Sequence, residues 1–211
     1  AASIVWGAHV PNRPGLRELV GPDHVVQGEG VRWFRRFLGE PENAPIRHPL
    51  ITSAFDSRTM GVRFGGGKGE TAATVIPSVG CPMGCNFCST SAMFGGKGSF
   101  YDFYRDGDEL YEVMAGLAQT LQVRSFFVMD ENFLLHRKRA LRLLERMRAN
   151  GKAWSLYVFS SANTLRLYSD EELLGLGISW VWLGLEGKQS AYVKLRDADT
   201  RAPVRRLQAH G

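Results

Sequence analysis

Three cysteines stand within eight residues of one another, in the segment "GCPMGCNFCSTS" that begins at Gly80. They are Cys81, Cys85 and Cys88, and the 211-residue chain has no other cysteine. Spacings of four and three residues, with a proline and a glycine between them, allow one loop to wrap its thiolates around one inorganic centre. An odd count without a secretory signal argues against a disulfide framework, which needs pairs and an oxidising compartment.

Three roles for these thiols are open. A structural zinc site normally closes with four ligands in two separated pairs, but no second pair is present and the histidines are scattered, at His9, His24, His48, His136 and His210. Cysteines buried only for packing would follow a strand or helix period, and these follow neither. An iron–sulfur cluster on three thiolates leaves one iron open for substrate or cofactor, whereas electron-transfer clusters take four cysteines. The count of three therefore favours a catalytic cluster.

The elements that must position this loop alternate between strand and helix. Strands are predicted over residues 71–79, 124–130, 153–161 and 179–186, and helices over residues 106–122, 136–150, 169–175 and 200–210. Strands joined by crossover helices predict a parallel sheet, and consecutive units without a return to the middle favour a barrel over an open sheet. Because the cysteines follow the first of these strands, we expect them at the carboxyl ends, where such folds carry their chemistry.

The first forty residues predict strand, short helix, strand and helix, in "SIVWG", "GLREL", "HVVQG" and "GVRWFRRFLG". This alternation is typical of an open α/β sheet. We therefore divide the α/β chain into a Rossmann-like remnant at residues 1–38, a linker at 39–70 and a core at 71–211. The linker's "FGGGKGE" is not a phosphate loop, because Val62 and Gly69 stand where the motif needs Gly and Ser or Thr. The chain begins without methionine and stops where a next strand is due, so we expect both ends to be cut.

Composition narrows the class of protein. With 44% hydrophobic and 22% charged residues the chain is typical of a soluble globular protein. It has no apolar run long enough to span a bilayer, so a cytoplasmic protein is expected. Much of the net charge of +5 lies in residues 136–152. There Leu141, Leu144 and Met147 follow a helical period, which places most arginines on a solvated face, and no aromatic residues interleave them as a stacking surface for nucleic acid requires. No nucleic acid partner is expected.

The Cys-x3-Cys-x2-Cys motif, with Phe87 before its last cysteine and directly after the first strand of a βα series, resembles the radical S-adenosylmethionine superfamily. The resemblance implies a 4Fe-4S cluster on Cys81, Cys85 and Cys88, whose open iron chelates the amino and carboxylate groups of S-adenosylmethionine. One electron then cleaves this cofactor to a 5′-deoxyadenosyl radical, which abstracts hydrogen from substrate. A reducing partner such as flavodoxin or ferredoxin is implied as well.

Two further segments match the superfamily. "MDENF" follows the second strand, where members receive the methionine ammonium, so Asp130, Glu131 and Asn132 are candidates for that contact. "GLEG" ends the fourth strand and puts Glu186 where members often bind the ribose hydroxyls. The alternatives are a helix cap for the first segment and a salt-bridged rim residue for the second.

The N-terminal segments "IVWGAHV" and "HVVQGEG" resemble the closing portion of the cobalamin-binding domain of one large branch. In that branch a Gly-Gly-like turn approaches the cobalamin tail, and Gly7 and Ala8 stand there; a different Rossmann-like domain is the alternative. The branch methylates unactivated carbons or carries out cyclisations and rearrangements. The resemblance thus implies a partial (βα) barrel after a cobalamin-type remnant, acting on a small or lipid-like substrate. Cobalamin-linked methyl transfer to carbon is expected, with a radical cyclase or isomerase as the alternative.

Overall fold

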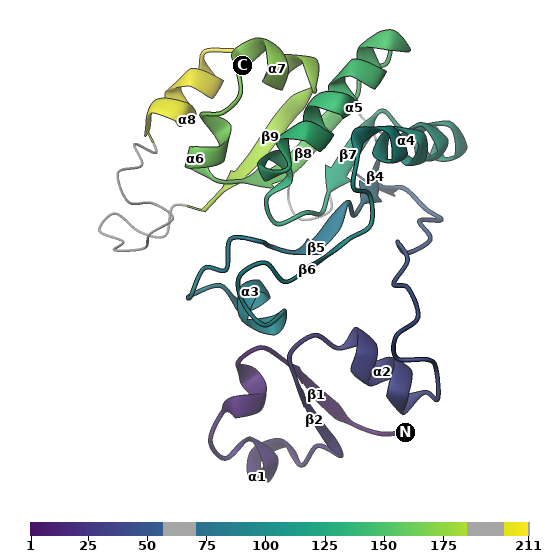
Figure 1. The fold of residues 1–211 in the computed structure, drawn as a ribbon, viewed down its shortest axis with the longest axis vertical. Coiled ribbons are helices and arrows are strands. Elements are labelled where there is room, and N and C mark those ends of the chain that lie inside the picture. The colour runs from purple at the N-terminus through teal and green to yellow at the C-terminus, as the bar shows by residue number, and fades with distance from the viewer. Residues whose placement is uncertain (57–70, 185–200, 211) are drawn as a thin grey trace. The chain divides into compact units, whose positions relative to one another are not determined.

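The computed structural model describes residues 1–56, 71–184 and 201–210 (Figure 1). The strands are β1 (Ile4–Gly7), β2 (His24–Gln27), β3 (Phe55–Asp56), β4 (Thr71–Val75), β5 (Ser78–Gly80), β6 (Phe100–Asp102), β7 (Ser125–Val128), β8 (Ser155–Ser160) and β9 (Ile178–Leu183). The α-helices are α1 (Leu16–Val20), α2 (Val31–Phe37), α3 (Ser89–Met93), α4 (Gly107–Leu121), α5 (Arg137–Ala149), α6 (Ala162–Leu165), α7 (Asp170–Gly175) and α8 (Arg201–Gln208), and 3-10 turns lie at η1 (Val10–Asn12) and η3 (Phe133–Leu135).

Contacts group the chain into two compact units. The first unit combines Ala1–Arg47 with Gly80–Tyr101, and the second combines His48–Val79 with Asp102–Gly211. The cysteine loop therefore groups with the N-terminal residues, although the linker separates the two in sequence. The division of the chain at residues 38 and 70 stays a prediction.

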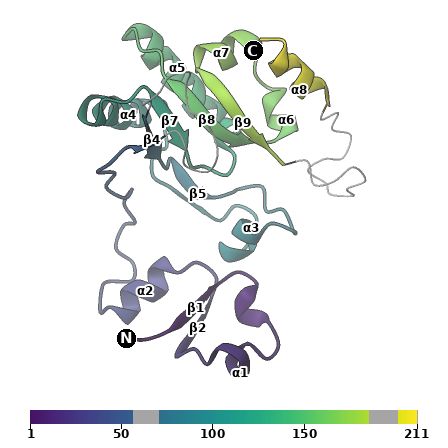
Figure 2. The same cartoon turned by 180° about the vertical axis from the view of Figure 1, so that it is seen from behind.

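The second unit contains a five-stranded sheet with the order β3-β4-β7-β8-β9. Its strands β4, β7, β8 and β9 are parallel and lie next to one another in this order (Figure 2). Their register aligns Val75, Val128, Val158 and Val181 in one row. Strand β3 pairs antiparallel with β4 at the edge. The predicted α/β class with a parallel sheet is confirmed, whereas closure toward a barrel stays a prediction.

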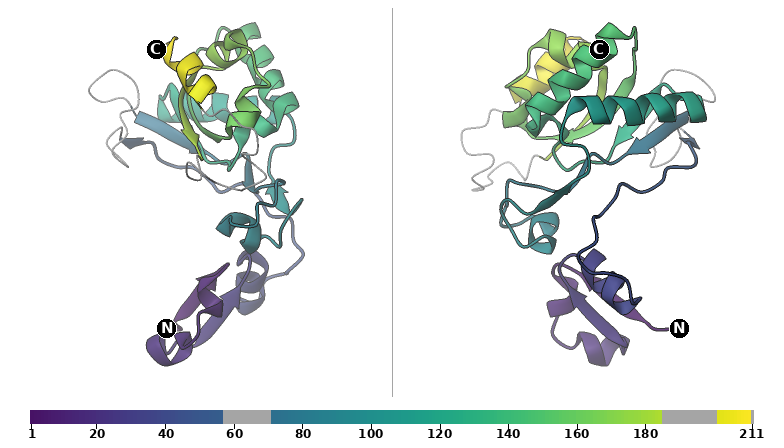
Figure 3. Two further views of the ribbon diagram at one scale, coloured as in Figure 1. Left: turned by 90° about the vertical axis from the view of Figure 1, so that its left-hand side faces the viewer. Right: turned by 45° about the vertical axis from the view of Figure 1, so that its right-hand side comes forward.

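The core of this unit lies between one face of the sheet and the helices that cross over it. Helices α4 and α5 lie side by side on that face (Figure 3). The fully buried side chains at this interface are apolar: Val75, Phe126, Val128, Leu156 and Val158 from the strands, and Leu110, Met114, Leu143 and Met147 from the helices. The 3.6-residue period of the sequence thus becomes the buried stripe of each helix.

Local signals set the helix ends. The side chain of Asp106 accepts hydrogen bonds from the amides of Asp108 and Glu109 at 3.0 and 2.9 Å, which caps the start of α4. Ser169 and Glu172 form a reciprocal capping box at α7. The predicted helices over 106–122 and 169–175 are confirmed, as Gly107–Leu121 and Asp170–Gly175.

The predicted strand over 71–79 is wrong in one respect, because it is broken into β4 and β5 at Ile76 and Pro77. Proline has no amide hydrogen to donate to a neighbouring strand. Its carbonyl instead accepts hydrogen bonds from the amides of Phe103 and Tyr104, at 2.9 and 3.2 Å. Strand β3 lies within the predicted linker, and three short elements, α3, β6 and α6, were not predicted.

The opposite face of the main sheet carries a chain of aromatic rings. Phe127, Phe159 and Trp182 stand on adjacent strands, with successive ring centroids 5.8 Å apart, and Trp180 follows at 6.4 Å. The two tryptophans are exposed. Among the helices of the described residues, none is both long and apolar enough to cross a membrane.

Candidate functional site

The three cysteines lie in a compact loop between the paired strands β5 and β6. Cys81 is buried, Cys85 and Cys88 are half-buried, and none of them forms a disulfide. The amide of Cys88 donates to the carbonyl of Cys85 at 3.1 Å, and the carbonyl of Cys88 accepts from the amide of Ala92 at 3.0 Å. The last cysteine is therefore also the N-cap residue of α3, which begins at Ser89.

Gly84 allows the two sides of the cysteine loop to approach each other closely. Gly84 has a φ of +66°, and a β-carbon there would stand 2.4 Å from the β-carbon of Lys97 and 2.5 Å from its α-carbon. Any larger residue would push the two sides of the loop apart. The amide of Gly98 donates to the carbonyl of Pro82 at 3.2 Å, which fastens the same two sides. Residues 82–84, between Cys81 and Cys85, therefore pack against residues 97–98.

The donors of this loop fit an iron–sulfur cluster in their chemistry. Residues 81–99 contain three cysteines but no Asp, Glu or His, so thiolates are the metal ligands that their side chains offer. Within the part of the chain that the structure describes, no three His, Cys, Asp or Glu side chains converge as a ready metal site.

Asp130 lies at the carboxyl end of β7, as the sequence predicted, but its carboxylate is engaged inside the protein. Oδ2 accepts hydrogen bonds from Ser78 Oγ and Arg139 Nη2, both at 2.6 Å. Oδ1 accepts from the amide of Asn132 at 3.0 Å. Asp130 is buried, and in this arrangement both its oxygens hold other parts of the chain.

The other two candidates from "MDENF" differ in exposure. Asn132 is buried, accepts from Ser160 Oγ at 3.2 Å and donates to Thr164 Oγ1 at 3.4 Å, so that it ties the end of β7 to the end of β8 and to α6. Glu131 is half-buried. Of the three predicted ammonium contacts, Glu131 is therefore the least buried residue, although its Oε2 atom is buried.

Sequence reasoning missed Arg139. It lies in the basic helix that was expected to expose most of its arginines, yet it is buried. Its Nη1 donates to Asp102 Oδ1 and to the carbonyl of Tyr104, both at 3.1 Å, while Nη2 donates to Asp130. A signal was present, because Arg139 precedes the buried Leu143 and Met147 by four and eight residues and so shares their face of α5.

Two histidines border this buried polar cluster. Burial lowers the pKa of His136, and the positive charge of Arg139 lowers it further against the opposing effect of Asp130 and Asp102. Burial also lowers the pKa of His48, whose Nε2 accepts the amide hydrogen of Ile76 at 3.1 Å. Both imidazoles are therefore neutral at pH 7.

The predicted cobalamin turn lies in the first unit. Gly7 ends β1, its carbonyl accepts from the amide of Gly28 at 3.1 Å, and Ala8 is buried. A β-carbon at Gly28 would stand 3.4 Å from the carbonyl oxygen of Met93, so the turn after β2 contacts the helix that follows Cys88. Strands β1 and β2 are parallel, with Gly7 opposite Gln27, so the turns that follow these two strands are adjacent. Glu186, the predicted ribose contact, lies outside the described residues.

A cavity of about 680 Å³ lies at the other end of the sheet. It is lined by residues of the edge strand β9 and by apolar side chains of α7 and α8, among them Leu173, Val204 and Leu207. It also borders Ser125 and Ser155, which begin β7 and β8. Since parallel sheets carry their ligands at the carboxyl ends of strands, we do not assign this cavity to the catalytic site.

Comparisons with known proteins point in one direction. No established family profile matches the chain. It is 27% identical over 217 aligned residues to an uncharacterized methyltransferase of Pyrococcus horikoshii, covering 87% of this chain and 45% of that protein. It is 32% identical over 103 residues to the bacteriochlorophyllide d C-12(1)-methyltransferase of Chlorobaculum tepidum, covering 48% of this chain and 21% of that enzyme.

A solved structure shares the fold. It is the radical S-adenosylmethionine methyltransferase TsrM of Kitasatospora setae, with cobalamin and a [4Fe-4S] cluster bound. The TM-score is 0.50 at 16% sequence identity, over 88% of this chain and 42% of that one. The chain spans less than half of the length of each of these three proteins. The chain thus shares its α/β fold with TsrM, and it shares sequence with two proteins that are named methyltransferases.

Proposed function

We propose that this chain is the cluster-binding part of a radical S-adenosylmethionine methyltransferase. The observation that carries the proposal is the cysteine loop, which presents three thiols and no Asp, Glu or His after the first parallel strand of the main sheet. The names of the two relatives support methyl transfer, and the fold of TsrM, a protein solved with a cluster and cobalamin, supports the cofactors.

Cys81, Cys85 and Cys88 would hold the cluster, which when bound supplies the electron that cleaves S-adenosylmethionine to a 5′-deoxyadenosyl radical. Glu131, the least buried residue of the three candidates, would receive the methionine ammonium. Glu186 would accept hydrogen bonds from the ribose hydroxyls. The network around Asn132 would keep the strand ends, and thus these contacts, in place.

The turn at Gly7 and Ala8 would lie against the tail of a cobalamin, at the carboxyl end of β1. Ligands of parallel α/β sheets bind at this edge. Methyl transfer with cobalamin consumes two molecules of S-adenosylmethionine per turnover. It gives S-adenosylhomocysteine from the methyl donor and 5′-deoxyadenosine from the radical source, so two products report on the reaction. A reducing partner such as flavodoxin or ferredoxin would supply the electrons.

Product analysis of the full-length protein tests this function. The protein is reconstituted with iron and sulfide without oxygen, given cobalamin and reductant, and incubated with S-adenosylmethionine. We expect both products from the unchanged protein and no 5′-deoxyadenosine from Cys85→Ala. 5′-Deoxyadenosine alone would replace methyl transfer by a radical cyclase or isomerase. Absence of both products from cluster-loaded protein would refute the proposal.

A further inference from the structure

Two segments flank the cysteine loop: the incoming stem at Ser78 and the returning stem at residues 102–104. Both stems form hydrogen bonds with one buried ion pair in the second unit. Ser78 stands three residues before Cys81 and donates to Asp130 at 2.6 Å. On the returning side, Asp102 and the carbonyl of Tyr104 each accept from Arg139 at 3.1 Å. The two stems therefore meet at the Asp130–Arg139 pair, whose N–O distance is 2.6 Å.

The Asp130–Arg139 pair is better suited to holding its hydrogen-bond partners in fixed positions than to adding net stability. The side chains of Arg139 and Asp130 are 1% and 2% exposed, and a buried ion pair often gives little stability over apolar residues of the same volume. The Nε of Arg139 is buried and has no hydrogen-bond partner among the described residues, which adds a cost. A guanidinium, however, is planar and donates in fixed directions, so its two ends hold their acceptors at a set distance.

The fork of Arg139 divides between the two stems. Nη1 contacts the returning stem, and Nη2 contacts Asp130, which in turn holds the incoming stem through Ser78. The neighbouring arginines of α5 do not share this role, because Arg142 and Arg146 pair with Asp108 and with other surface carboxylates. One side chain of α5 is thus placed to set the width of the loop at its base.

We propose that Arg139 is a positioning residue for the three thiols, acting with Asp130 and Ser78 to hold the loop stems so that the cysteines reach one cluster. This inference rests on the proposed function, because it takes the cysteines as the cluster ligands. It gives Asp130 a different task from the ammonium contact that the sequence suggested. The carboxylate acts on the cluster through the loop and not on S-adenosylmethionine.

Four variants of the full-length protein test the proposal: Arg139→Gln, Arg139→Lys, Ser78→Ala and the control Arg142→Gln on the same helix. After anaerobic reconstitution, the rate of cluster loss to a chelator and the electron paramagnetic resonance (EPR) spectrum of the reduced cluster are recorded. We expect Arg139→Gln to weaken cluster retention about 10- to 100-fold, as loss of an outer contact does at metal sites. Ser78→Ala should have a smaller effect in the same direction, Arg139→Lys should restore part of the loss, and Arg142→Gln should match the unchanged protein.

A readout without the cluster separates this inference from the proposed function. Amide hydrogen exchange of the cluster-free protein should rise across residues 78–104 in Ser78→Ala and Arg139→Gln, but not in Arg142→Gln. If Arg139→Gln does not fold, Ser78→Ala decides, since it keeps the ion pair. Exchange, cluster retention and spectrum all equal to those of the unchanged protein would overturn the proposal. Failure of the unchanged protein to take up a cluster would refute the proposed function, while the exchange result would still decide whether Arg139 and Ser78 hold the loop.

Discussion

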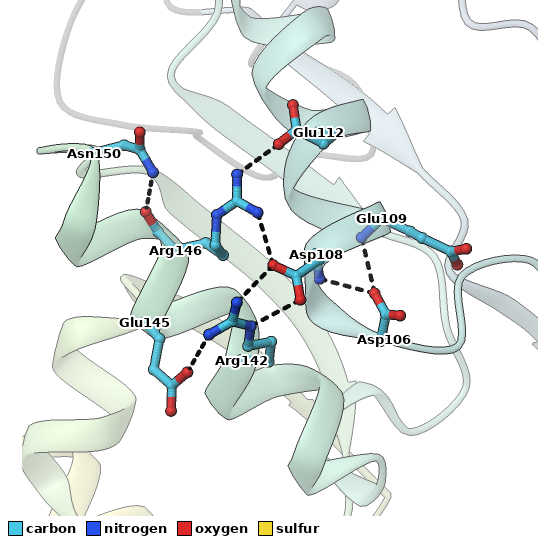
Figure 4. A network of polar contacts seen from close by, with 8 residues as sticks. All are labelled: Asp106, Asp108, Glu109, Glu112, Arg142, Glu145, Arg146 and Asn150. Atoms are coloured by element: carbon cyan, nitrogen blue, oxygen red, sulfur yellow. Dashed lines mark hydrogen bonds and ion pairs between the residues drawn. The ribbon is translucent and has the colours of Figure 1, made fainter.

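Helix α5 carries two ion-pair systems that differ in burial. Arg139 and Asp130 are 1% and 2% exposed. Arg142 and Arg146 pair with Asp108, Glu112 and Glu145 at 2.6 to 2.8 Å, but these side chains are 27% to 65% exposed (Figure 4). The distances are similar in the two systems, so proximity alone does not distinguish them.

The difference teaches that the surroundings of a charge, and not the number of its hydrogen bonds, decide what its loss would do. Exposed pairs are screened by salt and contribute little to folding. Breaking a buried pair leaves one charge without a partner in the protein interior. We therefore expect the surface network to be dispensable and the buried pair to be required for the cysteine loop.

The largest effect should follow replacement of Arg139 by leucine. Arg139→Leu leaves the Asp130 carboxylate buried without its cation, and loss of one partner of such a pair costs about 3–5 kcal/mol. Arg142→Leu should change the free energy of unfolding little. Urea unfolding of both variants measures the contrast, and equal losses would remove the distinction between the two systems.

A smaller loss of stability is expected at Gly107, where the backbones of α4 and α5 are in close contact. A β-carbon at Gly107 would stand 2.3 Å from the amide nitrogen of Leu143 and 2.5 Å from the carbonyl oxygen of Arg139. Gly107→Ala should therefore force α4 and α5 apart and cost about 1–3 kcal/mol. Gly116→Ala on the same helix is the matched control, because nothing lies within 4 Å of its β-carbon position.

At that control position alanine should stabilise the protein by about 0.5–1 kcal/mol, through its higher helix propensity. Thermal unfolding of the two variants gives the comparison. If both glycines tolerate alanine equally, the backbone contact between α4 and α5 is not what holds the surface carboxylates and arginines together.

Acidification should first affect the region around the half-buried His48 and His136. The folded protein lowers the pKa of His48 and His136 from an ordinary value of 6.5, in both cases mainly through burial. A lowered pKa favours the neutral form in the folded state, so this stability is complete above pH 6.5 and is lost as the pH falls through the lowered values. Unfolding measured from pH 7.5 to 5 should show the loss, and His48→Gln, whose amide oxygen can still accept from Ile76, should reduce the slope. An unchanged slope would contradict a half-buried, neutral His48.

The smallest effect is expected for the surface ion pairs of Asp108, which should lose their contribution to stability only at lower pH. Hydrogen bonds from Arg142 and then Arg146 lower the pKa of Asp108 from 3.8 to about 2. Its contribution is present above pH 3.8 and is lost as the pH falls toward about 2. Asp108→Asn should change stability little at pH 7, with a difference that high salt removes. A large loss that persists in high salt would show that this network is not merely a surface one.

The regular parts of the fold could be predicted because their signals are local. The periods of α4 and α5 and the caps at Asp106 and Ser169 depend on residues within a few positions of each other. Strand β3, by contrast, has two residues, and its pairing with β4 joins Asp56 to Thr71 across 14 intervening positions. Short elements depend on tertiary contacts that no local pattern records.

The candidate site shows the same division. The cysteine motif was found from spacing alone, since all its members lie on one loop. The burial of Arg139 depends on Asp102, which is 37 positions away, and that of Asp130 on Ser78, which is 52 positions away. The ammonium contact among Asp130, Glu131 and Asn132 and the ribose contact of Glu186 stay predictions.

The central claim is that three thiolates hold a cluster with one iron open to S-adenosylmethionine. The most direct test is the EPR spectrum of the anaerobically reconstituted and reduced protein before and after this cofactor is added, with iron and sulfide counted on the same sample. We predict about four irons and four sulfides per chain, a signal that changes when S-adenosylmethionine binds, and no signal from Cys88→Ala. A protein that binds stoichiometric zinc in place of iron, or a cluster whose spectrum ignores S-adenosylmethionine, would contradict the account.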